Sequence, residues 1–207
     1  MIFVIDSVPV DKREVARYLG YGKTNPDTAT DGLIDKMIKT LSPSAKVWSM
    51  ESPVTVSGAS VSLDGLCFES QSLAQNLKGC EKAVVFGATL GIAFDRLLQR
   101  TEILSPAEAA VLQAVGTAAI ESACDIFCER LGKTRPRFSP GYGDLPLTAQ
   151  KDLFKVLDLP RRLGVTLTES LLMVPTKSVT AIVGMGETKC ESGCATCTHP
   201  CVFRKEE

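Results

Sequence analysis

Four cysteines near the C-terminus are the residues of this chain most suited to chemistry. Cys190, Cys194, Cys197 and Cys201 lie in the stretch C-E-S-G-C-A-T-C-T-H-P-C. Thiolates this close together can converge on one metal, and the segment offers no apolar core to hold them otherwise. Zinc would give a structural site, whereas an iron–sulfur cluster would give a one-electron carrier. The spacing does not separate these two, and disulfides or free thiols stay open as a third interpretation.

A second candidate is the stretch R-F-S-P-G-Y-G-D-L-P-L at 137–147. Proline fixes φ and glycine permits backbone angles that other residues avoid, so their alternation indicates one fixed, irregular path. The Arg137 guanidinium, the Tyr142 ring and exposed backbone groups could together grip a small zwitterionic or aromatic ligand. The plainer interpretation is a rigid surface linker between a long helix and a pair of strands.

Several common kinds of site are excluded by the same sequence. The single histidine, His199, lies in the cysteine-rich stretch, so the body carries no Ser-His-Asp triad and no histidine-based metal site. The glycine turns V-F-G-A-T-L-G and G-M-G-E match neither a dinucleotide fingerprint nor a P-loop. The net charge of −1 and the pI near 6.0 give no basic surplus for nucleic acid. No apolar run approaches about 18 residues, and the N-terminal sequence lacks the features of a signal peptide, so we expect no membrane span and a cytoplasmic protein.

Hydrophobic periodicity gives the elements that must position these residues. Alternation of β-branched residues predicts two or three antiparallel strands within 46–68, followed by a buried strand at 82–91. The segments 164–175 and 178–184 resemble two paired strands interrupted at Pro175. Amphipathic spacing predicts helices at 11–21, 30–41, 70–77, 105–131 and 150–157.

The helix at 105–131 has the clearest boundaries. Ser105 as N-cap, Pro106 as first helical residue and Glu108 form a capping box, and Gly132 marks the end. Its main apolar stripe comprises Leu112, Val115, Ala119, Ala123 and Ile126. The mixture of long helices with a mixed or antiparallel sheet predicts an α+β fold, with one domain over 1–186 and a cysteine-rich tail over 187–207.

Two of these stretches, taken together, resemble a known family. R-F-S-P-G-Y at 137–142, followed by L-T-E-S-L-L-M-V-P-T-K-S-V-T-A at 167–181, is similar to the activation domain of cobalamin-dependent methionine synthase. That domain carries R-P-A-P-G-Y and then L-T-E-S-x-x-M-x-P-x-x-S-V-S, in the same order and at a similar distance. The clear match covers 105–184, and residues 1–100 match only loosely.

The resemblance implies a function. Members of this family bind S-adenosylmethionine and use it, with one electron, to convert oxidised cob(II)alamin back to methylcobalamin. The present chain is similar to free-standing forms, which would act in trans on a synthase lacking its own activation domain. Flavodoxin or ferredoxin would supply the electron. Such a module takes part in methyl transfer only together with its cobalamin partner, so its standing as an enzyme is left open.

The resemblance also implies site residues. Arg137 would contact the methionine part of S-adenosylmethionine, the backbone near Ser139 would bond to the adenine or the amino-acid end, and Tyr142 would lie beside the cobalt face. A family glutamate aligns with Glu121 and would meet a positive end of the ligand, although helical periodicity alone predicts a solvated residue there. Glu169 and Ser170 fall in the matched strand pair and are interpreted as structural.

The chain also departs from the family. G-D-L-P follows Tyr142 where the large synthases have P-A-C-P, and the cysteine tail has no counterpart in them. We therefore hypothesise that an iron–sulfur cluster in the tail relays the electron. Two alternatives remain: a reactivator of another corrinoid methyltransferase, and a metal-tailed binding or scaffold module with no ligand in the R-F-S-P-G-Y turn.

Overall fold

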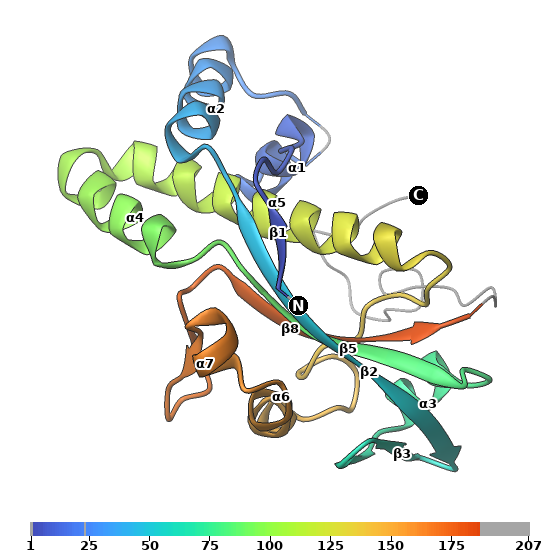
Figure 1. Ribbon diagram of the computed structural model, residues 1–207. Helices are drawn as coiled ribbons and strands as arrows, with labels where there is room; N and C mark the ends of the chain where they lie inside the picture. The colour runs from blue at the N-terminus through green and yellow to red at the C-terminus, as the bar shows by residue number, and fades with distance from the viewer. Residues whose placement is uncertain (1, 23, 187–207) are drawn as a thin grey trace.

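A curled antiparallel sheet forms the frame of the computed structural model, which describes residues 2–22 and 24–186 (Figure 1). Five strands follow the order β4-β3-β2-β5-β8, and a short sixth strand, β1, also pairs with β2. Their bounds are β1 Phe3–Ile5, β2 Ala45–Ser57, β3 Ser60–Leu63, β4 Leu66–Glu69, β5 Lys82–Thr89 and β8 Ser178–Met185. The strands expected within 46–68 and at 82–91 are confirmed, and so is the α+β fold.

Helices cover both faces of this sheet. On one side lie α1 (Lys12–Tyr18), α2 (Thr28–Leu41), α4 (Ile92–Leu104) and α5 (Pro106–Leu131), and on the other α3 (Gln71–Leu77), α6 (Gln150–Leu157) and α7 (Leu159–Leu163) (Figure 1). A short 3-10 turn, η1 (Leu147–Ala149), leads into α6. The five helices expected from the sequence are all present.

The long helix α5 is the element that carries the candidate site. Ser105 Oγ accepts from the Glu108 N–H and Pro106 begins the helix, while Gly132 ends it with φ of 89°, as the capping pattern predicts. The helix is long and apolar enough to cross a bilayer by length and composition, but most of it is buried in this fold. Core helices of soluble proteins pass the same test, so α5 is explained by its packing against the sheet.

The pairing of the C-terminal strands differs from the expectation. β8 does not pair with 164–175. It pairs with β5 along its whole length, from Ser178 opposite Thr89 to Met185 opposite Lys82. Ala181, Ile182 and Val183 are completely buried, which is typical of a strand with packing on both faces. The stretch 164–175 instead forms its own small hairpin, β6 (Thr166–Leu167) with β7 (Met173–Val174), because a polar turn with Leu171 at φ of 64° interrupts it.

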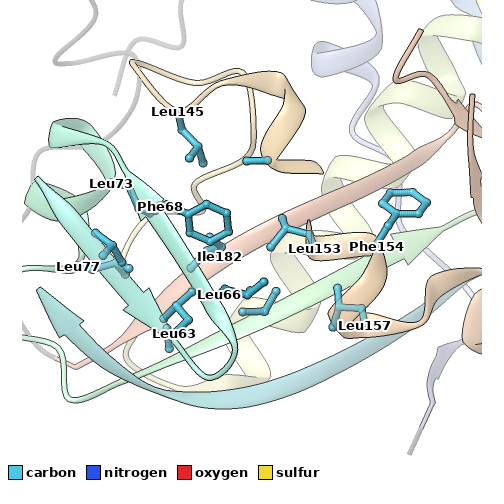
Figure 2. Close-up of a cluster of buried hydrophobic side chains, with 14 of the residues drawn as sticks. Leu63, Leu66, Phe68, Leu73, Leu77, Leu145, Leu153, Phe154, Leu157 and Ile182 are labelled. Atoms are coloured by element: carbon cyan, nitrogen blue, oxygen red, sulfur yellow. The ribbon is translucent and has the colours of Figure 1, made fainter. Parts of the chain in front are cut away.

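An apolar cluster fills the space between the sheet and α3, α6 and α7. Figure 2 shows side chains from three sources in it: strands, helices and the turn that follows Tyr142. Leu145 comes from that turn and is 1% exposed, and it points into the cluster. The candidate turn is therefore anchored in the core by its own side chain.

Three elements were not expected from the sequence. β1 and α7 are short, and α4 shows only a weak apolar stripe, with Phe94 and Leu98 buried four residues apart. At its far end Ile103 and Leu104 are 85% and 83% exposed, so the periodic signal fails there. The N-terminus of α4 nevertheless places Asp95 against the segment that precedes β8.

Candidate functional site

The segment that contains Arg137 runs along the outer edge of β8. The Phe138 N–H donates to the Ile182 carbonyl at 2.9 Å, and the Ile182 N–H donates back to Phe138 at 2.8 Å. Three residues earlier, the Arg135 N–H donates to the Gly184 carbonyl at 2.8 Å. Neighbouring side chains on such an extended segment point to opposite faces of the sheet. Phe138 accordingly packs on the apolar cluster of Figure 2, whereas Arg137 contacts α5.

The turn after Phe138 is held by its own backbone. The Tyr142 N–H donates to Ser139 at 3.0 Å, the Leu145 N–H donates to Tyr142 at 3.0 Å, and the Gly141 N–H donates to Leu145 at 2.9 Å. Gly141 has φ of 91°, a conformation that L side chains rarely adopt. The prediction of one fixed path through R-F-S-P-G-Y is therefore confirmed.

Asp144 fastens the same turn to α3. Its carboxylate accepts from the hydroxyl of Ser70, which caps α3, from the Gln71 N–H at 2.7 Å and from the Ser72 N–H at 3.1 Å. The Ser70 bond is the main cause that holds the pKa of Asp144 well below its usual range. The G-D-L-P sequence, which departs from the family pattern, thus has a structural role: it ties the turn to a helix N-terminus.

Arg137 and Glu121, two of the residues that the family resemblance implies for ligand binding, contact each other. Arg137 Nη2 donates to Glu121 Oε2 at 2.8 Å and lies 2.9 Å from Asp125 Oδ1. Arg137 Nη1 also donates to the Glu121 backbone carbonyl at 3.3 Å. The side chains of Arg137 and Glu121 are 21% and 35% exposed, so Glu121, which periodicity predicts to be solvated, is only partly exposed. The sequence did not single out Asp125, although its position four residues after Glu121 indicates that both side chains lie on the same face of the helix.

Two thiols lie beside this cluster but are not suited to nucleophilic chemistry. Burial raises the pKa of Cys124 to about 12 and that of Cys128 to about 11, against the opposing effect of Arg137. The same cysteines and carboxylates keep the pKa of Arg137 above its ordinary value, although burial acts to lower it. At neutral pH both thiols are protonated. The charged groups of the cluster are the side chains of Arg137, Glu121 and Asp125.

Ser139 and Tyr142 occupy the turn itself. Tyr142 is 58% exposed, and its ring meets Phe138 edge-on with the centroids 6.3 Å apart. The Ser139 carbonyl accepts the turn bond from Tyr142, whereas its N–H makes no hydrogen bond within the described part of the chain. A ligand at this position would find one backbone donor and one aromatic face.

The second matched stretch reaches α5 from another direction. Glu169 and Ser170 are exposed in the turn of the β6–β7 hairpin, where Ser170 and Thr168 share a hydroxyl hydrogen bond at 3.0 Å. Their interpretation as structural residues stays a prediction. Further along, Thr176 donates through its N–H and its hydroxyl to buried Asp95. The next residue, Lys177, donates to Thr117 on α5 at 2.9 Å.

The candidate metal ligands Cys190, Cys194, Cys197 and Cys201 lie outside the described residues. Within 2–22 and 24–186 no group of three or more His, Cys, Asp or Glu residues is arranged to hold a metal. The four cysteines in those ranges, Cys67, Cys80, Cys124 and Cys128, are free thiols.

Comparisons with known proteins point to one family. The model of the family described as "Vitamin B12 dependent methionine synthase, activation domain" matches residues 122–199. A solved structure described as "Crystal Structure of the MetH Reactivation Domain bound to AdoHcy" has the same fold, with a TM-score of 0.65 at 13% identity over 89% of this chain and 78% of that one. The comparison with curated proteins gave no match.

Proposed function

We propose that the chain is an S-adenosylmethionine-binding reactivation module, because residues 122–199 match the model of the vitamin B12 dependent methionine synthase activation domain family. The module supports reductive methylation of cob(II)alamin to methylcobalamin. The solved neighbour with the same fold was obtained with AdoHcy, the demethylated product of S-adenosylmethionine, which supports this choice of ligand.

The contact of Arg137 with Glu121 and Asp125 carries the proposal, because its charges suit the ligand. One guanidinium and two carboxylates leave a formal charge of −1. S-adenosylmethionine has a sulfonium, an ammonium and a carboxylate, so its net charge is +1. Partly buried carboxylates can accept from the ammonium and attract the sulfonium, while Arg137 contacts the methionine part. The Ser139 N–H and the Tyr142 ring supply a donor and a stacking face for the rest of the ligand.

In this reaction the role of the chain is to position the ligand. The methyl group leaves the sulfonium for cobalt, one external electron is consumed, and S-adenosylhomocysteine is released. None of these events transfers a proton to a side chain, which agrees with a body that has no histidine. A turn fixed by Asp144, Leu145 and its own hydrogen bonds holds the ligand in one orientation, which is the contribution that such a reaction needs.

The finer proposal is that the module acts in trans on a cobalamin-dependent methionine synthase lacking its own activation domain. The described residues are largely accounted for by the reactivation-domain fold, so the cobalamin would be bound elsewhere. A reduced flavodoxin or ferredoxin would supply the electron. We place the protein in the cytoplasm because its four described cysteines are free thiols.

We also propose that Cys190, Cys194, Cys197 and Cys201 bind an iron–sulfur cluster that relays this electron. The support is the spacing of four thiols within twelve residues. Anaerobic purification followed by visible and EPR spectroscopy tests it. A coloured protein that becomes EPR-active when reduced is the expected result. A colourless protein with one zinc ion would replace the relay with a structural site.

The function itself is tested by reactivation in trans. The purified chain is mixed with an inactive Co(II) methionine synthase, S-adenosylmethionine and a reductant, and methylcobalamin is followed by its absorbance. We expect methylcobalamin with the wild type and with Glu51→Gln, which alters only an exposed pair with Lys82, and loss with Arg137→Ala. Reactivation of a different corrinoid protein alone would reassign the partner. No methylation of any corrinoid would overturn the proposal.

A further inference from the structure

The exposed side of α5 is a narrow polar stripe. From Val111 to Cys124 the helix is buried except at Gln113, Thr117, Glu121 and Ser122. Three of these follow one another at intervals of four residues, and Asp125 continues the row. Residues four apart lie one above the other on a helix, at a rise of about 6 Å. The stripe therefore carries the Glu121 and Asp125 carboxylates at one end and a hydroxyl, Thr117, one turn before them.

Lys177 contacts this stripe at Thr117, one helical turn before Glu121. Its Nζ donates to Thr117 Oγ1 at 2.9 Å, and the Thr117 hydroxyl donates to the Gln113 carbonyl at 2.9 Å. The same ammonium lies 5.5 Å from the centre of the Phe94 ring. A Cβ at Gly116 would collide with the Phe94 ring and would lie 3.1 Å from Lys177 Cε, so the glycine makes room chiefly for the ring against which the lysine stem lies.

Lys177 differs from Arg137 in its charge balance. Arg137 contacts two carboxylates, whereas no ion pair forms at Lys177 within 2–22 and 24–186. Asp95 lies near it, but the oxygens of Asp95 accept from the N–H and hydroxyl of Thr176. Burial lowers the pKa of Lys177, which is the expected effect on an ammonium without a carboxylate at hydrogen-bond distance. Of the two cations that contact the stripe, Lys177 is therefore the one better suited to bind an anionic group of a ligand.

We propose that Lys177 binds the carboxylate of the amino-acid end of S-adenosylmethionine, while Glu121 accepts from the ammonium on the same carbon. This inference rests on the proposed function. The two charges of an α-amino acid are adjacent, and the stripe offers the opposite charges one helical turn apart. Arg137 then holds Glu121 and Asp125 in place and lies against the methionine chain. The assignment makes Lys177 a specificity residue, which admits ligands with a free amino-acid end.

Calorimetric titrations with two ligands test it. S-adenosylmethionine carries the carboxylate, and 5′-methylthioadenosine shares the nucleoside but lacks the amino-acid end. We expect Lys177→Met to weaken S-adenosylmethionine about tenfold or more and to change 5′-methylthioadenosine less than twofold, with Lys177→Arg restoring part of the loss. Lys82→Met, at an exposed lysine on β5, is the matched control and should bind both ligands like the wild type.

The outcomes separate the two proposals. Equal S-adenosylmethionine affinity in Lys177→Met and wild type, or equal losses for both ligands, would overturn the role of Lys177 and leave the function intact. A wild type that binds neither ligand would refute the proposed function itself. If Lys177→Met does not fold, wild-type protein labelled with ¹³C at lysine Cε gives the answer. The Lys177 signal should shift with S-adenosylmethionine and not with 5′-methylthioadenosine, and a signal unmoved by both ligands contradicts the contact.

Discussion

Arg137 and Glu121 form a two-point contact: Nη2 donates to Oε2 at 2.8 Å, and Nη1 donates to the Glu121 backbone carbonyl at 3.3 Å. The arginine thus binds both the side chain and the main chain of α5. Asp125, 2.9 Å from the same Nη2, adds a second carboxylate. Helix α5 and the R-F-S-P-G-Y turn are thus connected through the Arg137 guanidinium.

Replacing Glu121 by glutamine should impair binding more than folding. Arg137 keeps Asp125 as a partner, so we expect the melting temperature to change little. The affinity for S-adenosylmethionine should fall about tenfold or more, because a charge-assisted contact with the ligand is lost. Titration calorimetry measures this, with Glu51→Gln as the matched surface control. Unchanged affinity in Glu121→Gln would remove this residue from the site.

The rigidity of the turn depends on Gly143. It has φ of 54°, and an added Cβ would lie 2.7 Å from the Ser72 Cβ. Gly58 has a similar φ of 63° but nothing within 4 Å, so Gly58→Ala isolates the backbone cost, which is about 1–2 kcal/mol. We expect Gly143→Ala to lower the free energy of unfolding by more than this and also to weaken ligand binding. Chemical denaturation of both variants checks it, and equal losses would show that the contact with α3 is unimportant.

Asp144 should make folding sensitive to acid. Its pKa is lowered from 3.8 chiefly by the Ser70 hydroxyl, so its stabilising effect is present above that pH and disappears as the pH falls through the folded-state value. Asp144→Ala should cost on the order of 1 kcal/mol at pH 7, the usual loss for a helix cap. The difference from the wild type should shrink below pH 3.8.

The thiols of α5 should be unreactive in the folded protein. Cys124 is completely buried with a pKa of about 12, whereas Cys67 is exposed. Brief alkylation with iodoacetamide at pH 8, followed by peptide mapping, should label Cys67 and leave Cys124 unmodified until denaturant is added. Equal labelling of the two in the native protein would contradict the packing of α5.

Deprotonation of Cys124 should lower the stability of the folded protein at alkaline pH. Its pKa is raised from 9.0, so the unfolded chain loses this proton first as the pH rises from about 9 towards about 12. The wild type should therefore lose more stability between pH 8 and pH 10 than Cys124→Ala, as measured by urea denaturation. Identical pH slopes in the two proteins would show that the thiol is accessible to solvent.

The sequence predicts those elements whose signals are local. The capping box of α5 fixes both ends of that helix, and alternation reveals β2 to β5. The partner of β8 is not a local property. It depends on which strand can pair with β8 along its whole length while apolar clusters cover both faces of Ala181, Ile182 and Val183, and β5 rather than the preceding hairpin does so. The weakly periodic α4 is missed for a related reason, since only a few of its residues meet the core.

The candidate site divides in the same way. The turn at 137–147 is visible from its prolines and glycines, and the family motif points to Arg137, Ser139, Tyr142 and Glu121. The stripe on α5 is not visible, because periodicity cannot tell a solvated glutamate from one that meets an arginine from a distant segment. Asp125 and Lys177 are recognised only in the structure, where Arg137 and Lys177 both contact the same face of α5.

Titration calorimetry of the full chain with S-adenosylmethionine tests the central claim most directly. We predict saturable binding at one site in the wild type, and its loss in an Arg137→Ala protein that still folds. Absence of heat and of any thermal shift in the wild type would contradict the claim, and so would an Arg137→Ala protein that binds the ligand equally well.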